Sequence, residues 1–405
     1  MPYETKQDSP GFKVWNRFKK DYLALFGFFV IGLSILVSIM GYLICPDDSP
    51  NTNRMHIQYS IKKPGSSFNL LLIRKKKKID TANVLHKLFY GQVPFFDEIP
   101  INRYYFKGDS IYVNEFTGVK TDSLENIAYH LVQVAFPAEG KILKNGDNFH
   151  FIDLYGNKVS VGLGDLKKII EKKFIIHRTY ILGTDLYGRD LLSRLLLGSR
   201  ISISVGLMAV IISLVLGVFM GSLAGFYGGW VDRCISWFIN VVWSLPALLL
   251  VIAISFALGK GIWQIFVAVG LTMWVEVARL VRGQILVIRE SEFVEAGRAM
   301  GMNNVRLIRR HILPNIGGPI LVVAASNFAS AILLEAGLSF LGFGAQPPFP
   351  SWGSMIKENY GYIIIDAAFL ALIPGLAIML VVYGFNLLSI GLRDAFNIRD
   401  QNTMI

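Results

Sequence analysis

Residues 201–231 read ISISVGLMAVIISLVLGVFMGSLAGFYGGWV, a run without a single charged side chain. A helix that crosses the hydrocarbon core of a bilayer needs about 20 consecutive, predominantly apolar residues. This run therefore predicts a membrane-spanning helix. Five more uncharged runs have the same character: Tyr22–Cys45, Cys234–Gly259, Gly261–Val275, Ile312–Leu334 and Ala367–Leu392. Together they predict an all-α polytopic membrane bundle of six transmembrane helices.

The composition of the whole chain agrees with a membrane protein. Its 405 residues are 53% hydrophobic and only 17% charged, whereas soluble domains carry about 25% charged residues. This balance excludes an ordinary soluble enzyme and an intrinsically disordered chain. The first apolar run has no small-residue cleavage site near Cys45, so we interpret it as a span and not as a signal peptide. The two cysteines, Cys45 and Cys234, suggest neither a disulfide framework nor a thiolate metal site.

Lysine and arginine in the segments that flank the spans predict the orientation. Five lie within residues 1–22 and seven between residues 276 and 314, but only one, Lys357, lies between residues 335 and 366. Segments rich in Lys and Arg stay in the cytoplasm. Both termini are therefore expected in the cytoplasm.

A long segment between the first two spans, residues 46–182, has the pattern of a folded domain outside the cytoplasm. Two strand–turn–strand patterns, at residues 103–113 and 149–161, place Gly with Asp or Asn between β-branched and aromatic residues, which is a hairpin signal. Apolar residues at helical spacing predict a helix over Ser123–Val134. We therefore predict that residues 46–182 form a mixed α+β insertion.

Most of the net charge of +11 lies in this insertion and its flanks. The run Arg74–Lys78 is compatible with a patch for lipid headgroups or nucleic acid, but a solvated charged edge is the simpler interpretation, and we expect no nucleic-acid partner. His130, His150 and His177 have no carboxylate at metal-ligand spacing, so we predict no metal site.

Motifs of enzyme chemistry are not found along the chain. It contains no phosphate loop, no H-E-x-x-H, no G-x-S-x-G and no C-x-x-C, which are the usual signatures of nucleotide, zinc and nucleophile sites. We therefore predict no catalytic residues, no cofactor and no enzymatic activity in this chain.

The segment between the fourth and fifth spans, residues 289–315, is the most informative. Acidic residues at the start of a helix are favoured by the macrodipole, and Ser291 is expected to cap the helix. Gly301 is expected to end it in a left-handed conformation, and Pro314 to break the chain before the next span. The pattern is a helix, a sharp turn and a second helix. An amphipathic hairpin lying on the lipid surface is the alternative.

This segment resembles the EAA signature of ABC importer permeases. Glu295-Ala296-Gly297, Gly301 and Leu313-Pro314 carry the resemblance, with Gly297 where a third alanine is usual. A second stretch, Gly183-Thr184-Asp185 with Gly188-Arg189-Asp190, resembles the G-T-D-x-x-G-R-D segment of the dipeptide, oligopeptide and nickel branch, C-type subunit. Residues 334–353 resemble the outer loop of the same branch.

The resemblance implies a type I ABC importer permease, a multi-pass protein of the bacterial inner membrane. It implies a second homologous permease subunit, two cytoplasmic ATP-binding subunits that hydrolyse ATP, and an extracytoplasmic substrate-binding protein. A coupling helix at about residues 289–304 would contact an ATPase. The implied substrate is a short peptide, with nickel or another small solute as the alternative. An ATP-independent channel or secondary transporter is the alternative from another class, but it would need ionisable residues within the membrane.

The implied organisation has four parts, and one of them departs from the family. Residues 1–45 form the cytoplasmic N-terminus and first span, 183–394 the permease core with five spans, and 395–405 a cytoplasmic tail. The insertion, residues 46–182, stands where family members usually have a short link. It is compatible with a docking platform, a lid or a contact for the partner permease. Pro246 and Pro374, which interrupt the third and sixth spans, are compatible with alternating access or with simple helix kinks.

Overall fold

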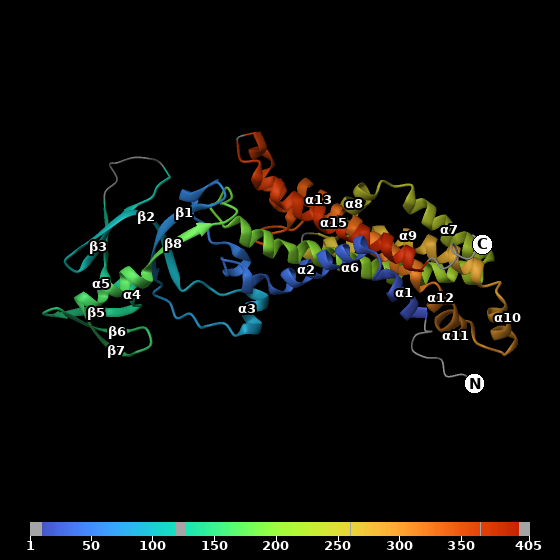
Figure 1. The fold of residues 1–405 in the computed structure, drawn as a ribbon, viewed down its shortest axis with the longest axis horizontal. Coiled ribbons are helices and arrows are strands. Elements are labelled where there is room, and N and C mark those ends of the chain that lie inside the picture. The colour runs from blue at the N-terminus through green and yellow to red at the C-terminus, as the bar shows by residue number, and fades with distance from the viewer. Residues whose placement is uncertain (1–9, 119–125, 260, 365, 397–405) are drawn as a thin grey trace. The chain divides into compact units, whose positions relative to one another are not determined.

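The computed structural model describes residues 10–118, 126–259, 261–364 and 366–396. The chain divides into two compact units, which are coloured by residue number in Figure 1. The helical unit comprises residues 1–39 and 198–405, and the insertion unit comprises residues 40–197. The chain passes between the two units within helices α2 and α6.

The helical unit contains the long apolar helices. The last residues of α2 and the first residues of α6 belong to the insertion unit. The long helices and the shorter ones between them are α1 Pro10–Phe18, α2 Tyr22–Ile44, α6 Leu191–Tyr227, α7 Gly229–Trp243, α8 Ala247–Leu258, α9 Ile262–Ile288, α10 Glu292–Ala299, α11 Asn304–Leu307, α12 Leu313–Asn315, α13 Gly317–Leu341, α14 Trp352–Asn359 and α15 Phe369–Phe396. Among the described residues, α2, α6, α9, α13 and α15 are each long and apolar enough to cross a membrane.

A sixth span depends on the pair α7 and α8. The sequence predicts a span over Cys234–Gly259 that Pro246 interrupts, and the structure has two helices there with a bend of 95° between them. Pro246 stands directly before α8 as its N-cap, where its ring is compatible with the first turn of a helix but not with the interior of the preceding one. Pro374, by contrast, lies inside α15 without ending it. The described helices therefore give five or six candidate spans.

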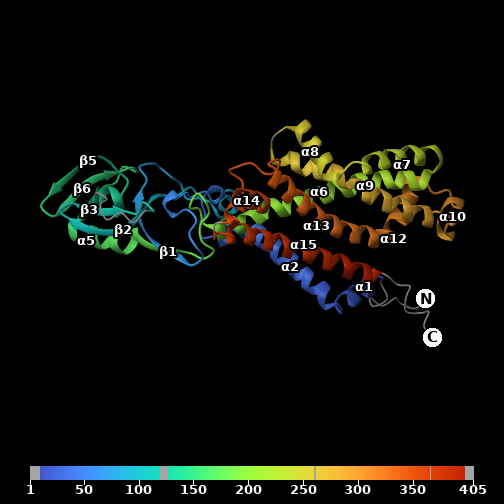
Figure 2. The ribbon, with the colours of Figure 1, turned by 90° about the horizontal axis from the view of Figure 1, so that it is seen from above.

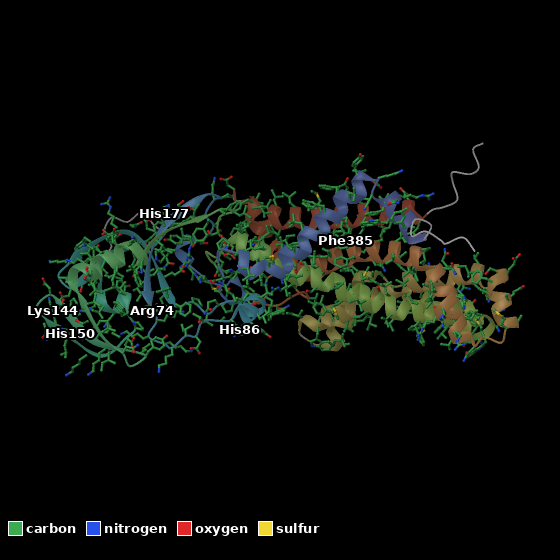
Figure 3. All side chains as sticks on the ribbon, turned by 60° about the horizontal axis from the view of Figure 1, so that its bottom comes forward. Arg74, His86, Lys144, His150, His177 and Phe385 are labelled. Carbon is green, nitrogen blue, oxygen red and sulfur yellow. The ribbon has the colours of Figure 1, made fainter. Side chains whose placement is uncertain are left out.

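Two sets of contacts hold the long helices together. Helix α13 packs along α15 and against α9, and Figure 2 shows α13 beside α15. Phe328 of α13 stacks on Phe385 of α15 with ring centroids 4.0 Å apart, and Figure 3 labels Phe385 among the helices. Helix α6 presents Gly217, Gly221 and Gly225 to α9, where an added Cβ would lie 2.5 to 2.9 Å from α9 atoms. Small residues four apart allow such close backbone approach.

The insertion unit is built from two antiparallel sheets. Its elements are β1 Ser66–Arg74, α3 Val84–Tyr90, β2 Phe96–Lys107, β3 Ser110–Glu115, β4 Ile127–His130, α4 Leu131–Ala135, β5 Ala138–Asn145, β6 Asn148–Asp153, β7 Lys158–Gly162, α5 Leu163–Ile169 and β8 Ile175–Tyr180. One sheet has the order β4-β3-β2-β1-β8 and the other the order β5-β6-β7. The hairpins predicted at residues 103–113 and 149–161 are confirmed as β2–β3 and β6–β7.

A shared core joins the two sheets and their helices. Its fully or almost fully buried members are Leu71, Ile111, Val113, Leu131, Val132, Phe149, Phe151, Leu166 and Ile170. The helix predicted over Ser123–Val134 is partly wrong, because residues 127–130 form strand β4 and only α4 is helical. Pairing of Ile127 with Val113 of β3 outweighs the helical spacing, and His130 begins α4 by accepting a hydrogen bond from the Val132 amide. Residues 123–125 lie outside the described residues.

Candidate functional site

The coupling segment, residues 289–315, begins where α9 ends at Ile288. Ser291 occupies the N-cap position of α10, but the prediction that its hydroxyl caps the helix is wrong. It donates instead to the Ile288 carbonyl, at 2.5 Å, so the side chain closes the turn between α9 and α10. The Ser291 carbonyl accepts hydrogen bonds from the amides of Val294 and Glu295. The turn is therefore held from both sides of Ser291.

Helix α10 ends in a turn that requires a left-handed residue. Gly301 has a φ of 74°, as predicted. The Gly301 amide donates to Arg298 O at 2.9 Å and the Met302 amide donates to Gly297 O at 3.1 Å. This pair of bonds is the Schellman motif. Asn303 then begins α11, because its side-chain oxygen accepts a hydrogen bond from the Val305 amide. The sharp turn between two short helices is present.

Apolar contacts fix the coupling segment to the long helices. Val294, Leu307, Ile312 and Ile316 share one buried cluster with Val277, Val281 and Ile285 of α9. Leu313, at the start of α12, packs on the same cluster, whereas Pro314 is exposed. Gly297 is buried against Leu307, and a Cβ built there would lie 2.8 Å from Leu307 Cδ1. A movement of this segment is thus mechanically linked to α9.

The opposite side of the segment is exposed and apolar. Phe293 and Ala296 of α10 and its C-cap residue Met300 recur at helical spacing, and all three are exposed, with Met300 70% exposed. We call these three residues the α10 stripe. Glu295 lies beside the stripe and is also exposed. Glu295 and Ala296 were predicted from the family motif, whereas Phe293 and Met300 were not, although their spacing from Ala296 indicates a common face.

The second predicted motif, residues 183–190, lies in the insertion unit and is buried. The side chain of Asp185 accepts hydrogen bonds from the amides of Tyr187 and Arg189, both at 2.9 Å. It also pairs with Arg189 Nε at 2.6 Å. Thr184 bridges to a separate stretch by donating to Tyr59 O and accepting from the Lys62 amide. These bonds bring residues 56–62 against the motif.

The two glycines of this motif are required by close contacts. Gly183 and Gly188 have φ values of 82° and 70°. A Cβ at Gly188 would lie 1.8 Å from His56 O, and one at Gly183 would lie 2.2 Å from Lys62 O. The motif therefore fixes residues 56–62 against residues 183–190 and does not form an open site.

Asp190, the last residue of the motif, begins α6. Its carboxylate accepts hydrogen bonds from the amide and hydroxyl of Ser193, which is an N-cap interaction. The Ser193 hydroxyl also accepts a hydrogen bond from the Asp47 amide at 2.8 Å. Burial raises the pKa of Asp190, and this effect is larger than the lowering of the pKa by the hydrogen bonds from Ser193. Asp190 therefore fixes where α6 starts relative to the chain that follows α2.

A buried charged cluster near this motif was not predicted. Glu98 of β2 pairs with both terminal guanidinium nitrogens, Nη1 and Nη2, of Arg178 on β8, at 2.5 and 2.9 Å. Arg54 donates to the same carboxylate at 2.7 Å, and His56 Nε2 lies 3.0 Å away. Burial alone would raise the pKa of Glu98, but the hydrogen bonds from His56 and Arg178 outweigh it, so the pKa is well below its usual range. The partners are too distant in sequence for spacing to reveal them.

A second unpredicted network lies in the helical unit, in the stretch that resembles the family's outer loop. The buried Glu335 of α13 accepts hydrogen bonds from Ser202 of α6 at 3.1 Å and from Ser339 at 2.7 Å. Ser202 also accepts from the Trp352 amide, and Ser351 caps α14. Glu335 therefore joins α6, α13 and the start of α14.

Comparison with known proteins supports a single family. Residues 199–399 match the family described as binding-protein-dependent transport system inner membrane component. Residues 9–64 match the N-terminal TM domain of oligopeptide transport permease C. The chain between these two matches contains most of the insertion unit.

Curated relatives carry names of the same kind. The chain is 43% identical over 215 residues to a dipeptide transport system permease protein, DppC, of Alkalihalophilus pseudofirmus, covering 53% of this chain and 70% of the relative. It is 43% identical over 216 residues to a glutathione transport system permease protein, GsiD, of Pectobacterium atrosepticum, covering 53% and 71%.

Among solved structures, a chain of the MetNI methionine ABC transporter in an inward-facing conformation is 21% identical, with a TM-score of 0.42, over 51% of this chain and 96% of that one. The family match and the relatives, together with the apolar helices described above, show that this chain belongs to the binding-protein-dependent transport system inner membrane components, as an ABC importer permease of the dipeptide and oligopeptide family.

Proposed function

We propose that this permease forms half of the translocation path of an ATP-driven importer for short peptides, together with a second homologous permease subunit. The relatives named for dipeptide and glutathione transport support this substrate class, since glutathione is itself a peptide. Two ATP-binding subunits and a substrate-binding protein complete the complex. Nickel or another small solute is the second candidate substrate, favoured only by membership of the same branch.

The observation that carries the coupling proposal is the combination of an anchored side and an exposed side in one segment. Val294 and Leu307 are buried in the cluster of α9, while Met300 of the α10 stripe is 70% exposed. An exposed apolar surface of this kind is typical of a protein interface. We infer that residues 289–304 dock on a cytoplasmic ATPase, with Glu295, Ala296 and Gly301 at the contact and Leu313 and Pro314 at the junction with α13. Rigid docking would transmit a movement of the ATPase to α9.

In the orientation that we propose, both termini and the coupling segment lie in the cytoplasm and residues 46–182 lie outside it. It requires six spans, so α7 and α8 together would count as one. The predicted bounds 46–182 fall within the insertion unit. A membrane-impermeant thiol reagent applied from outside should modify Asn145→Cys and spare Asn304→Cys, in a Cys234→Ser background. The reverse pattern would contradict this orientation.

Substrate class is tested by uptake into vesicles that contain the whole complex with its binding protein. Radiolabelled dipeptides and tripeptides should accumulate when ATP is supplied, and unlabelled peptide should compete. Nickel should neither accumulate nor compete. Nickel accumulation without peptide uptake would reverse the choice between the two candidates, and uptake that does not require ATP would favour a channel or secondary transporter.

A further inference from the structure

Helix α3 of the insertion unit has its amphipathic pattern reversed relative to a helix of a water-soluble domain. Lys87 points into the unit, where it pairs with Asp48 at 2.8 Å. The apolar residues point away from it, with Val84 71% and Leu85 72% exposed. None of the seven residues of α3, all of which the structure describes, is buried. A helix on a soluble domain normally places its apolar side on the core, so α3 is arranged for an apolar surrounding.

The apolar residues of α3 form one continuous face. At about 100° per residue, Val84, Leu85, Leu88 and Phe89 occupy one side of the helix and Lys87 occupies the other. Phe89, on this face, is 63% exposed. An arc of this width is typical of helices that lie in the plane of a membrane interface.

The end of α3 is held beside the end of a membrane span. Gly91, which follows α3, lies so close to α2 that an added Cβ would be 2.9 Å from the ring of Tyr42. The amide of Gln92 donates to Asp48 O at 2.8 Å. Tyr42 is two residues before the end of α2, which corresponds to about 3 Å along the helix axis. The C-terminal end of α3 therefore lies beside the last turn of α2, a helix long and apolar enough to cross a membrane.

The surface of α2 in its last turn is itself apolar and exposed. Leu43 and Ile44, in its last turn, are each nearly half exposed, as expected of a span that contacts lipid. Exposed lysines, Lys76, Lys77 and Lys78, precede α3 in the sequence, and basic segments of this kind attract anionic headgroups. The insertion unit thus carries exposed apolar residues on α3 and at the end of α2, and a basic segment that is close to α3 in the sequence.

From these observations we propose that α3 is a membrane-surface anchor of the insertion unit. Its face of Val84, Leu85 and Phe89 inserts between the headgroups and acyl chains of the leaflet on the insertion side. The occupant of this face is phospholipid. The anchor would hold the insertion unit on the bilayer through α3, while α2 itself remains a span.

The test compares two exposed leucines of the same unit. Leu143 on β5 is 62% exposed, and Figure 3 shows its neighbour Lys144 at the end of the insertion unit far from His86 of α3. Leu85→Cys and Leu143→Cys are made in the full chain with Cys234→Ser, because Cys234 is exposed and Cys45 is buried. Each is labelled with a nitroxide and reconstituted with its partner subunits in vesicles of phosphatidylcholine and phosphatidylglycerol. Collision rates with oxygen, which partitions into lipid, and with a water-soluble nickel chelate are then measured.

We expect the ratio of oxygen to nickel-chelate collisions to be several-fold higher at position 85 than at position 143. A label at Phe89→Cys should behave like the label at position 85. Equal ratios at positions 85 and 143 would overturn the proposal, because α3 would then face water. Shielding of position 85 from both reagents would also overturn it, because another protein subunit would then cover the helix.

Discussion

At the scale of single residues, Gly297 and Gly301 lie four positions apart yet are glycine for different reasons. Gly297 is buried, and a Cβ there would lie 2.8 Å from the end of the flexible Leu307 side chain. Gly301 has a φ of 74°, and a Cβ there would meet no atom within 4 Å. Position 297 is therefore limited by packing and position 301 by backbone conformation. Alanine, which is usual in the family at position 297, needs only a small shift of Leu307.

Gly301→Ala is expected to loosen the turn that ends α10. The left-handed conformation costs a residue with a Cβ roughly 1–2 kcal/mol, which corresponds to a factor of about 5–30 in an opening equilibrium. The Met302 amide, which donates to Gly297 O across this turn, should exchange its hydrogen faster by about that factor. Gly301→Asn should have a smaller effect, because Asn tolerates this conformation.

Gly361→Ala serves as the control for this prediction. Gly361 is exposed, has no positive φ and also has no atom within 4 Å of a built Cβ. Its substitution should leave exchange at Met302 unchanged. If Gly301→Ala also leaves that exchange unchanged, the turn does not depend on the left-handed glycine.

At the scale of elements, the Glu98 cluster joins strands β2 and β8 to the chain at Arg54 and His56. The pKa of Glu98 is lowered in the folded state, against about 4.3 in an unfolded chain. A lowered carboxyl pKa adds stability that is fully present above about pH 4.3 and is lost as pH falls through the folded pKa. The insertion unit should therefore lose stability in acid.

Glu98→Gln should destabilise the insertion unit at pH 7 and weaken its sensitivity to acid. Breaking a buried pair by removing one partner costs roughly 3–5 kcal/mol. The measurement is thermal unfolding of the purified chain in detergent at pH 7 and at pH 3, followed through its β-sheet signal. Asp97→Asn is the matched control, because Asp97 neighbours Glu98 but its side chain is 67% exposed, so its loss should cost less than about 1 kcal/mol. A Glu98→Gln variant as stable as the Asp97→Asn variant would show that the cluster contributes no net stability.

Elements whose stability comes from their own composition were predictable from sequence, and elements that depend on distant partners were not. The apolar runs that became α2, α6, α9, α13 and α15 and the hairpins with Gly turns belong to the first kind. Strand β4 belongs to the second, because its pairing with β3 outweighs a helical spacing. The α10 stripe could have been found from the spacing of Phe293, Ala296 and Met300. The Glu98 cluster could not, because its members are 42 to 80 residues from Glu98.

At the scale of the whole molecule, each unit carries a different kind of exposed apolar surface. The helical unit exposes the α10 stripe on a segment anchored to α9, and the insertion unit exposes the face of α3 beside the end of α2. We assign the first to a protein partner and the second to lipid. The distinction rests on what each segment is fixed to, since α10 packs on α9 and the end of α3 lies beside Tyr42 of α2.

The coupling role of the α10 stripe is tested most directly by one comparison of charge insertions. Met300→Asp places a carboxylate in the exposed stripe, whereas Val305→Asp places the same charge on a 63% exposed apolar residue outside residues 289–304, in the first turn of α11, where acidic residues are tolerated. Peptide-stimulated ATP hydrolysis and peptide uptake are measured in vesicles that contain the whole complex. Met300→Asp should reduce both by at least about tenfold, the effect of roughly 1.4 kcal/mol at an interface, while Val305→Asp keeps them near the wild-type level. Wild-type hydrolysis and uptake in Met300→Asp would contradict a role for residues 289–304 in docking the ATPase.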